Sequence, residues 1–117
     1  MYNEGTIIAL SSAPGSGAIA IIRLSGEDAI SKTDLFFKSK SGKKLSDSKG
    51  YSISYGNLID NNEIIDEVVI SVYKAPHSYT GENIIEISCH GSTYVQQRIL
   101  SLFTNVGVKL ASAGEFT

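Results

Sequence analysis

Residues 51–74 constrain the fold most. YSISYGNLI (51–59) and EIIDEVVISVYK (63–74) are both rich in β-branched and aromatic residues, a composition typical of strands. Only Asp60, Asn61 and Asn62 separate them, and such residues are frequent in tight turns. The pair therefore predicts a β-hairpin. In its second strand the even positions predict one buried face, interrupted by Asp66; the apolar residues of that face are Ile64, Val68, Ile70 and Val72.

Four further segments have the composition of strands. TIIALSS (6–12), AIAIIRLS (18–25) and NIIEISCH (83–90) are aliphatic runs bounded by turn formers, and a short last strand is expected at 108–110. The polar, lysine-rich stretch 38–50 is expected to be a loop.

Two helices are expected between these strands. AISKTDLFF (29–37) predicts the first, with Ser25 as its cap and acidic residues in its first turn. The second is expected to begin at Ser92 or Thr93, with Thr93 and Gln96 at capping-box spacing, and to end at Gly107. One face of this helix is predicted to be apolar and consists of Val95, Ile99, Leu102 and Phe103.

The resulting order of strands and helices predicts an α+β fold. The order mixes hairpins with crossovers, which favours a two-layer sandwich with helices on one face of a mixed sheet. With 117 residues, 42% of them hydrophobic, and a net charge of −2, the chain is expected to form one domain, residues 1–117. A single cysteine and no secretory signal favour a reducing, cytoplasmic location. Because the chain stops abruptly after GEFT, we expect it to be part of a longer protein.

The adjacent residues Cys89 and His90 resemble a nucleophile and its base, but strand geometry argues against that interpretation. Neighbouring side chains on a strand point to opposite faces. Cys89 shares a face with Ile85 and Ile87, so we expect it in the core. One cysteine and two histidines also fall short of a usual zinc ligand set. We therefore expect no catalytic residue and no metal ligand here.

Glu86 and Arg23 are charged residues within apolar strands. Alternation places Glu86 with Ser88 and His90 on the face opposite Cys89, which suits either a solvated sheet face or a ligand site. Arg23 needs a partner if it is buried. That partner is either a carboxylate (Glu86, Asp66 or Glu67) or an anionic ligand, and the residues alone leave both alternatives open.

Nucleotide-binding motifs are absent from the sequence. Gly15 and Gly17 precede a strand, which differs from the dinucleotide fingerprint, and no GxxxxGK[ST] segment occurs. We expect these glycines to form a tight turn that allows close backbone approach. The lysines within 38–49 suit a solvated loop, with contact to nucleic-acid phosphates as the alternative.

Three segments together resemble a known family. APGSGAIAIIRLSG (13–26), APHSYTGENIIEISCHG (75–91) and AGEFT (113–117) resemble the N-terminal domain of the bacterial tRNA-modification GTPases called MnmE or TrmE. The resemblance extends over essentially the whole chain. It implies a fold similar to the folate-binding region of aminomethyltransferases, with a helical domain and a GTPase domain that are absent from this chain.

The resemblance also implies cofactors and partners. The domain would bind a tetrahydrofolate derivative, 5-formyl- or methylene-tetrahydrofolate, and hold the protein as a homodimer. The complete protein would be a GTP hydrolase that modifies the wobble uridine of tRNA, with one carbon from folate and a flavin-dependent partner, MnmG (GidA). GTP, Mg²⁺ and K⁺ would bind only in the missing GTPase domain, so the fragment alone would not hydrolyse GTP. No membrane partner is implied.

The family's folate-contacting residues correspond to Arg23 and Glu86, and a further lysine of the site would lie beyond Thr117. A carboxylate such as Glu86 could accept both the amino group and the adjacent ring N–H of a reduced pterin. Arg23 would meet ligand oxygens or fix Glu86, and the turn 75–82 would shape the pocket wall. Two alternative functions remain: a dimerisation module in which this pair is structural, and a tRNA-contacting module that uses the 38–49 lysines.

Overall fold

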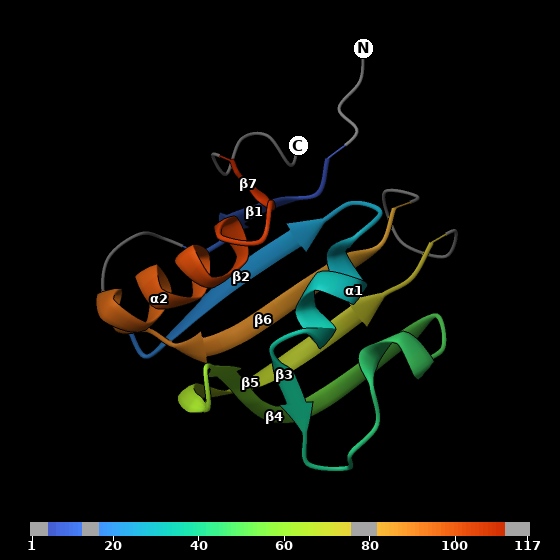
Figure 1. The fold of residues 1–117 in the computed structure, drawn as a ribbon, viewed down its shortest axis with the longest axis horizontal. Helices are drawn as coiled ribbons and strands as arrows, with labels where there is room; N and C mark the ends of the chain where they lie inside the picture. Colours follow the sequence, from blue (N-terminus) through green and yellow to red (C-terminus); the bar gives the residue numbers. More distant parts are fainter. Residues whose placement is uncertain (1–4, 13–16, 76–81, 112–117) are drawn as a thin grey trace.

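A computed structural model describes residues 5–12, 17–75 and 82–111. The described residues form one seven-stranded sheet in the order β3-β4-β5-β6-β2-β1-β7, and both α-helices cover the same face of it (Figure 1). The strands are β1 (Ile7–Leu10), β2 (Ile19–Ser25), β3 (Phe37–Ser39), β4 (Tyr51–Asp60), β5 (Glu63–Tyr73), β6 (Ile84–His90) and β7 (Lys109–Leu110). The helices are α1 (Ala29–Asp34), the short 3-10 helix η1 (Leu45–Asp47) and α2 (Thr93–Thr104).

The sheet is mixed, and its topology confirms the predicted α+β class. β4 and β5 form the expected hairpin, with positive φ at Asn61 and Asn62 in its turn. β6 lies between β5 and β2 and pairs antiparallel with both, whereas β1 pairs parallel with β7. β6 is therefore the central strand, and its residues 84–88 are paired with β2 on one side and with β5 on the other.

The predicted first helix begins at Ala29 as expected but is too long at its C-terminal end. Its N-cap is Asp28 and not Ser25, and it has no acidic residue in its first turn. Ser25 instead ends β2 and its hydroxyl donates to Glu82. The helix stops at Asp34, and Phe37 begins the edge strand β3, whose first residue was predicted to be helical and whose other two were predicted to lie in a loop.

The β4–β5 hairpin contains a bulge that the alternation rule missed. The strand register shifts between Leu58 and Ile59, so the residues opposite them are Asp66 and Ile64, and Ile65 is the extra residue. Ile65 packs against the core, and Ile64 is exposed. The predicted buried face is therefore wrong at Ile64 and right at the three later positions of the strand.

The cap of α2 is Ser92. Its hydroxyl accepts a hydrogen bond from the backbone N–H of Val95 at 3.0 Å. The expected capping box at Thr93 is wrong, because Gln96 is buried and donates instead to the carbonyl of Gly91. α2 ends at Thr104, and Gly107 follows with a φ of +94°.

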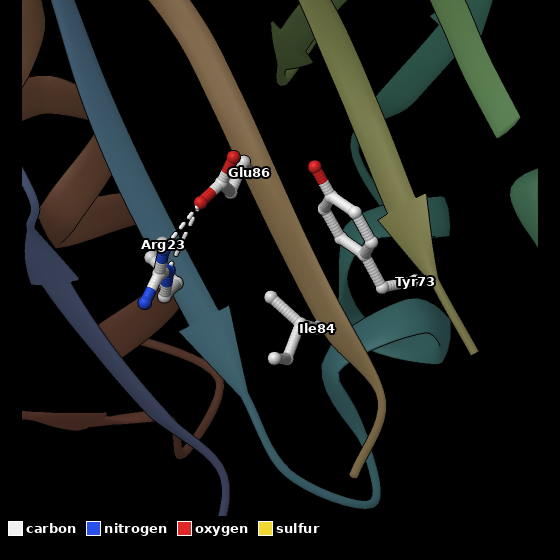
Figure 2. Close-up of a pocket in the computed structure, with 4 residues that line it drawn as sticks. All are labelled: Arg23, Tyr73, Ile84 and Glu86. Atoms are coloured by element: carbon white, nitrogen blue, oxygen red, sulfur yellow. Dashed lines mark hydrogen bonds and ion pairs between the residues drawn. The ribbon is translucent and has the colours of Figure 1, made fainter. Parts of the chain in front are cut away.

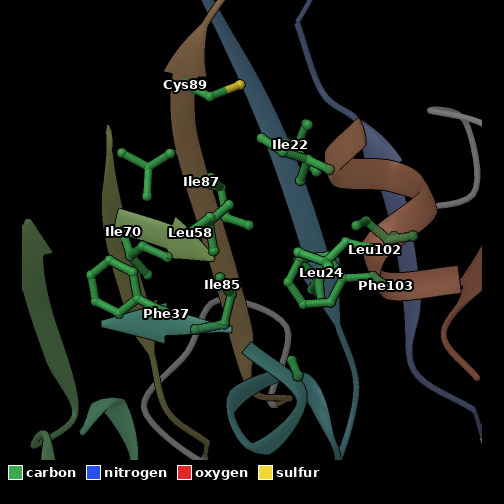
Figure 3. Packing of buried hydrophobic residues seen from close by; sticks show 14 of the residues in the cluster. Ile22, Leu24, Phe37, Leu58, Ile70, Ile85, Ile87, Cys89, Leu102 and Phe103 are labelled. Atoms are coloured by element: carbon green, nitrogen blue, oxygen red, sulfur yellow. The ribbon is translucent and has the colours of Figure 1, made fainter. Parts of the chain in front are cut away.

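The hydrophobic core lies between the sheet and its two helices. Alternate residues of the central strands point into it, as Figure 3 shows for Ile22, Ile70, Ile85 and Ile87. Ile99, Leu102 and Phe103 of α2 are buried against them, as the helical pattern predicted. Cys89 is also in this layer, which confirms its predicted place in the core.

Candidate functional site on the open face of the sheet

The face of the sheet opposite the helices carries the remaining strand residues. We call it the open face; on β6 it displays Ile84, Glu86, Ser88 and His90. Several of its apolar side chains are exposed: Ile19, Tyr51, Ile53, Tyr55 and Val69. Arg23 and Glu86, the two charged residues predicted to form a site, both lie on this face.

Arg23 and Glu86 are direct neighbours on β2 and β6. They are opposite each other in the strand register, and Nε and Nη2 of Arg23 donate to Glu86 Oε2 at 3.1 and 2.5 Å. Their side chains retain 28% and 23% of their exposure. Of the three carboxylates considered as partners for Arg23, the structure therefore selects Glu86, and the pair is only partly removed from water.

Arg23 occupies only one oxygen of this carboxylate. The hydrogen bonds from Nε and Nη2 of Arg23 both end on Oε2, and in Figure 2 the other oxygen, Oε1, points away from Arg23. A carboxylate offers about four lone-pair sites, so Oε1 retains capacity for a donor from outside the protein.

Tyr73 and Ile84 complete the hollow around the pair. Together with Arg23 and Glu86 they line a cavity of about 240 Å³, and Figure 2 shows the Tyr73 ring on the side of Glu86 away from Arg23. Burial, followed by the charge of Glu86, raises the pKa of the Tyr73 hydroxyl. The hollow therefore combines an ion pair, a neutral phenol and an aliphatic floor, the mixture usual in small-molecule sites.

His90 and Asp66 form a second polar cluster near the other end of β6. Asp66 Oδ1 lies 2.7 Å from His90 Nδ1, and Asp66 Oδ2 accepts from the backbone N–H of His90 at 2.8 Å. The Asp66 side chain is nearly buried, whereas His90 is largely exposed.

Burial raises the pKa of the neighbouring Cys89 thiol to about 11, which agrees with the rejection of a cysteine nucleophile.

Sequence reasoning found two residues of the hollow and missed the other two. Tyr73 and Ile84 are opposite each other in the β5–β6 register, which the linear sequence does not reveal. Ile84 lies two residues before Glu86 on β6, so strand alternation alone would have placed it on the same face. The part of the predicted pocket wall at 76–81 lies outside the described residues, as do 13–16, where a tight turn was expected, and 112–117.

The lysine-rich stretch lies at the sheet edge, at the β3 end. Its lysines are exposed, and Lys40 pairs with Glu67 at 3.7 Å.

Within 5–12, 17–75 and 82–111, no three metal-ligating side chains gather into a potential metal site, and neither α-helix has the length and apolar character needed to cross a bilayer.

Fold and hollow together define an α+β domain with a polar hollow on the open face of its sheet. A family model described as "GTP-binding protein TrmE N-terminus" matches residues 6–117. The chain therefore belongs to the family of the TrmE N-terminal region.

Individual relatives agree with this assignment. Proteins named tRNA modification GTPase MnmE are 50% identical over 117 residues in Flavobacterium johnsoniae and 51% identical over 114 residues in Parabacteroides distasonis. The one from Syntrophomonas wolfei is 53% identical over 113 residues. These matches cover 100%, 96% and 95% of this chain but 25% of each relative. The chain thus spans about a quarter of the length of these relatives.

Proposed function

We propose that this chain is the tetrahydrofolate-binding and dimer-forming domain of a GTPase that modifies tRNA. The observation that carries the proposal is the Glu86 carboxylate, held by Arg23 through one oxygen, in a hollow of the open face. The name of the relatives supports the tRNA-modification part, and the geometry of the hollow supports a small polar ligand.

The residues of the hollow fit a reduced pterin. Glu86 Oε1 is placed to accept a hydrogen bond from the amino group or the adjacent ring N–H of such a ligand. Accepting both requires Oε2 as well, so the ligand would replace one of the two bonds from Arg23. Arg23 would then turn a donor toward a ligand oxygen. Tyr73 offers an aromatic face for the flat ring.

The complete protein would combine this domain with a helical domain and a GTPase domain that holds GTP, Mg²⁺ and K⁺. When bound here, 5-formyl- or methylene-tetrahydrofolate would supply the one-carbon unit for the wobble uridine. The flavin-dependent partner MnmG (GidA) would act with it on the tRNA. This chain's own part is to bind and orient the folate.

Dimerisation through this domain is the second element of the proposal. Tyr51, Ile53 and Tyr55 are exposed, and as alternate residues of β4 they project from the same face of the sheet. An exposed apolar surface of this kind is suited to burial against a second copy of the chain. Light scattering at micromolar concentration should give twice the chain mass. A monomer mass across the whole concentration range would contradict this element alone.

Glu86→Gln tests the ligand proposal. The substitution keeps the shape and replaces an acceptor oxygen by a donor amide that opposes a ligand donor. Loss of a charge-assisted hydrogen bond costs about 1.5–3 kcal/mol, so affinity for 5-formyltetrahydrofolate should fall roughly ten- to a hundredfold in calorimetry. The melting temperature should change little, because both partners of the pair are partly exposed.

Glu63→Gln is the matched control. Glu63 is an exposed carboxylate in the β4–β5 hairpin and is not among the described residues that line the hollow. This variant should bind folate like the parent. If instead Glu86→Gln melts far below the parent and keeps its folate affinity, the pair is structural and the ligand proposal fails.

A further inference from the structure

The lysine-rich stretch concentrates positive charge on one edge of the sheet. Residues 38–49, which we call the basic segment, hold five of the ten basic residues of the chain and one acidic residue, Asp47, so their net charge is +4. The whole chain has a net charge of −2, so the remaining residues together carry −6. The basic segment begins in the edge strand β3 and returns to the start of β4 along the edge of the sheet (Figure 1).

Four of the five lysines in the basic segment are available to an anion. Lys40 pairs with the carboxylate of Glu67. The other four lysines are exposed and form no ion pair with any residue that the structure describes; they are Lys38, Lys43, Lys44 and Lys49. Their charges are therefore not neutralised within the described part of the chain.

The backbone that carries these lysines is fixed at three points. The Leu45 side chain is buried in the core. The Asp34 carboxylate accepts the backbone N–H groups of Leu45 and Ser46 at 2.8 and 3.0 Å, one on each oxygen. Lys74 Nζ donates to the carbonyl oxygens of Ser46 and Ser48 at 2.8 and 2.5 Å. Because the basic segment has a defined path, an anion that binds it pays a smaller ordering cost.

The basic segment is joined to a strand end that lines the Arg23–Glu86 hollow. Tyr73 of that hollow is followed by Lys74, whose backbone N–H donates to the carbonyl oxygen of Gly50 at 2.7 Å. Gly50 comes directly after Lys49 in the chain. An anion held at the end of the basic segment therefore lies on the β5 side of the hollow.

From this arrangement we propose that the basic segment binds the phosphate backbone of the tRNA on which the complete protein acts. Ammonium groups are point charges that neutralise phosphates without reading base edges, so the contact is independent of base sequence and depends steeply on salt. The RNA contact and the folate hollow occupy different surfaces, so one domain can have both. This inference rests on the tRNA part of the proposed function and adds which surface of the domain faces the RNA.

Two variants with the same change of net charge separate a local contact from long-range electrostatics. Lys43→Gln/Lys44→Gln removes two positive charges from the basic segment. Lys109→Glu lowers the net charge by the same amount on β7, the edge strand at the opposite end of the sheet. All three lysines are exposed, so both variants should melt like the parent.

The experiment measures binding of unmodified tRNA to the complete protein as its gene encodes it, by fluorescence anisotropy over a series of salt concentrations. The double variant should weaken binding roughly tenfold at about 100 mM salt. Its slope of log K against log salt should be shallower by about two, because two phosphate contacts are lost. Lys109→Glu should keep the parent's slope and lose no more than about twofold. Calorimetry with 5-formyltetrahydrofolate should give the parent's affinity in both variants.

Each other outcome overturns a separate idea. Equal effects of the two variants, or an unchanged slope in the double variant, overturn the RNA contact, while binding of tRNA and folate by the parent keeps the proposed function. Unchanged tRNA binding with weaker binding of the flavin-dependent partner makes the basic segment a protein contact and overturns this inference. Failure of the parent to bind tRNA overturns the tRNA part of the proposed function and this inference with it.

Discussion

The two faces of the sheet differ although the same strands supply both. The face under α1 and α2 is aliphatic and almost fully buried, whereas the open face mixes ions, hydroxyls and exposed apolar side chains. On β6 the change occurs at every residue, from buried Ile85 to half-buried Glu86 to buried Ile87. One strand thus specifies the core with one set of residues and the candidate site with the other.

This division explains how the domain tolerates a charged pair at its centre. β6 is the central strand, yet the side chains of Arg23 and Glu86 stay partly in contact with water because α1 and α2 both lie against the other face of the sheet. Burial of the same pair under α2 would carry a large desolvation penalty. The free-energy cost of keeping a charged pair in the middle of the sheet is therefore low, and the core face supplies the stability.

The largest expected effect comes from matched truncations on the two faces. Ile87→Ala removes a fully buried side chain and should lower the free energy of unfolding by about 2–5 kcal/mol. Ile53→Ala removes an exposed side chain of the same type on β4 and should change it by less than about 0.5 kcal/mol. Urea unfolding of both variants at low protein concentration measures the difference.

An equal loss in both variants would contradict the division between the faces. A loss in Ile53→Ala that grows with protein concentration would sharpen the comparison instead. It would mean that a second copy covers the open face, since stability then includes the association energy.

Alternation along β6 was readable from the sequence because strand periodicity is local. Cys89 in the core and Glu86 on the other face followed from the period of two alone. The pairing of Glu86 with Arg23 was not readable, because 63 residues separate them and only the register decides between three candidate carboxylates. Tyr73 was missed for the same reason.

The failures in the fold have equally local causes. Ile64 and Ile65 are identical residues, so the sequence carries no mark of the bulge that exchanges their faces. β3 lies in a lysine-rich stretch, and an edge strand of three residues needs few apolar side chains. Ser25 satisfied the pattern of a helix cap, but the structure uses it to end β2.

The second prediction concerns the strand ends. There the closeness of two backbone segments, and not the face of the sheet, decides how a substitution changes the stability. A Cβ on Gly91 would lie 2.1 Å from the carbonyl oxygen of Gly17, whereas a Cβ on Gly17 would meet no atom of the described residues within 4 Å. Gly91→Ala should therefore destabilise the protein by about 1–3 kcal/mol. Gly17→Ala should be neutral or stabilise by up to about 1 kcal/mol, because it restricts the unfolded chain. Thermal unfolding of the two variants provides the test, and equal melting temperatures would disprove the close approach.

The smallest expected effect is a difference in the pH dependence of stability between the parent protein and a variant of the core face. Cys89 points into the core, where burial raises the pKa of its thiol from 9.0 to about 11. As pH rises above 9 the unfolded chain loses this proton first, so the stability present at lower pH is lost progressively until about 11. At pH 10 the loss should be about 1 kcal/mol. Cys89→Ala removes this contribution, so between pH 8 and 10 its stability should fall less than the parent's by about that amount. Tyrosines and lysines titrate in both proteins and cancel in the difference. Parallel stability curves over this range would place the thiol in contact with water, on the side of the sheet where Glu86 and His90 lie.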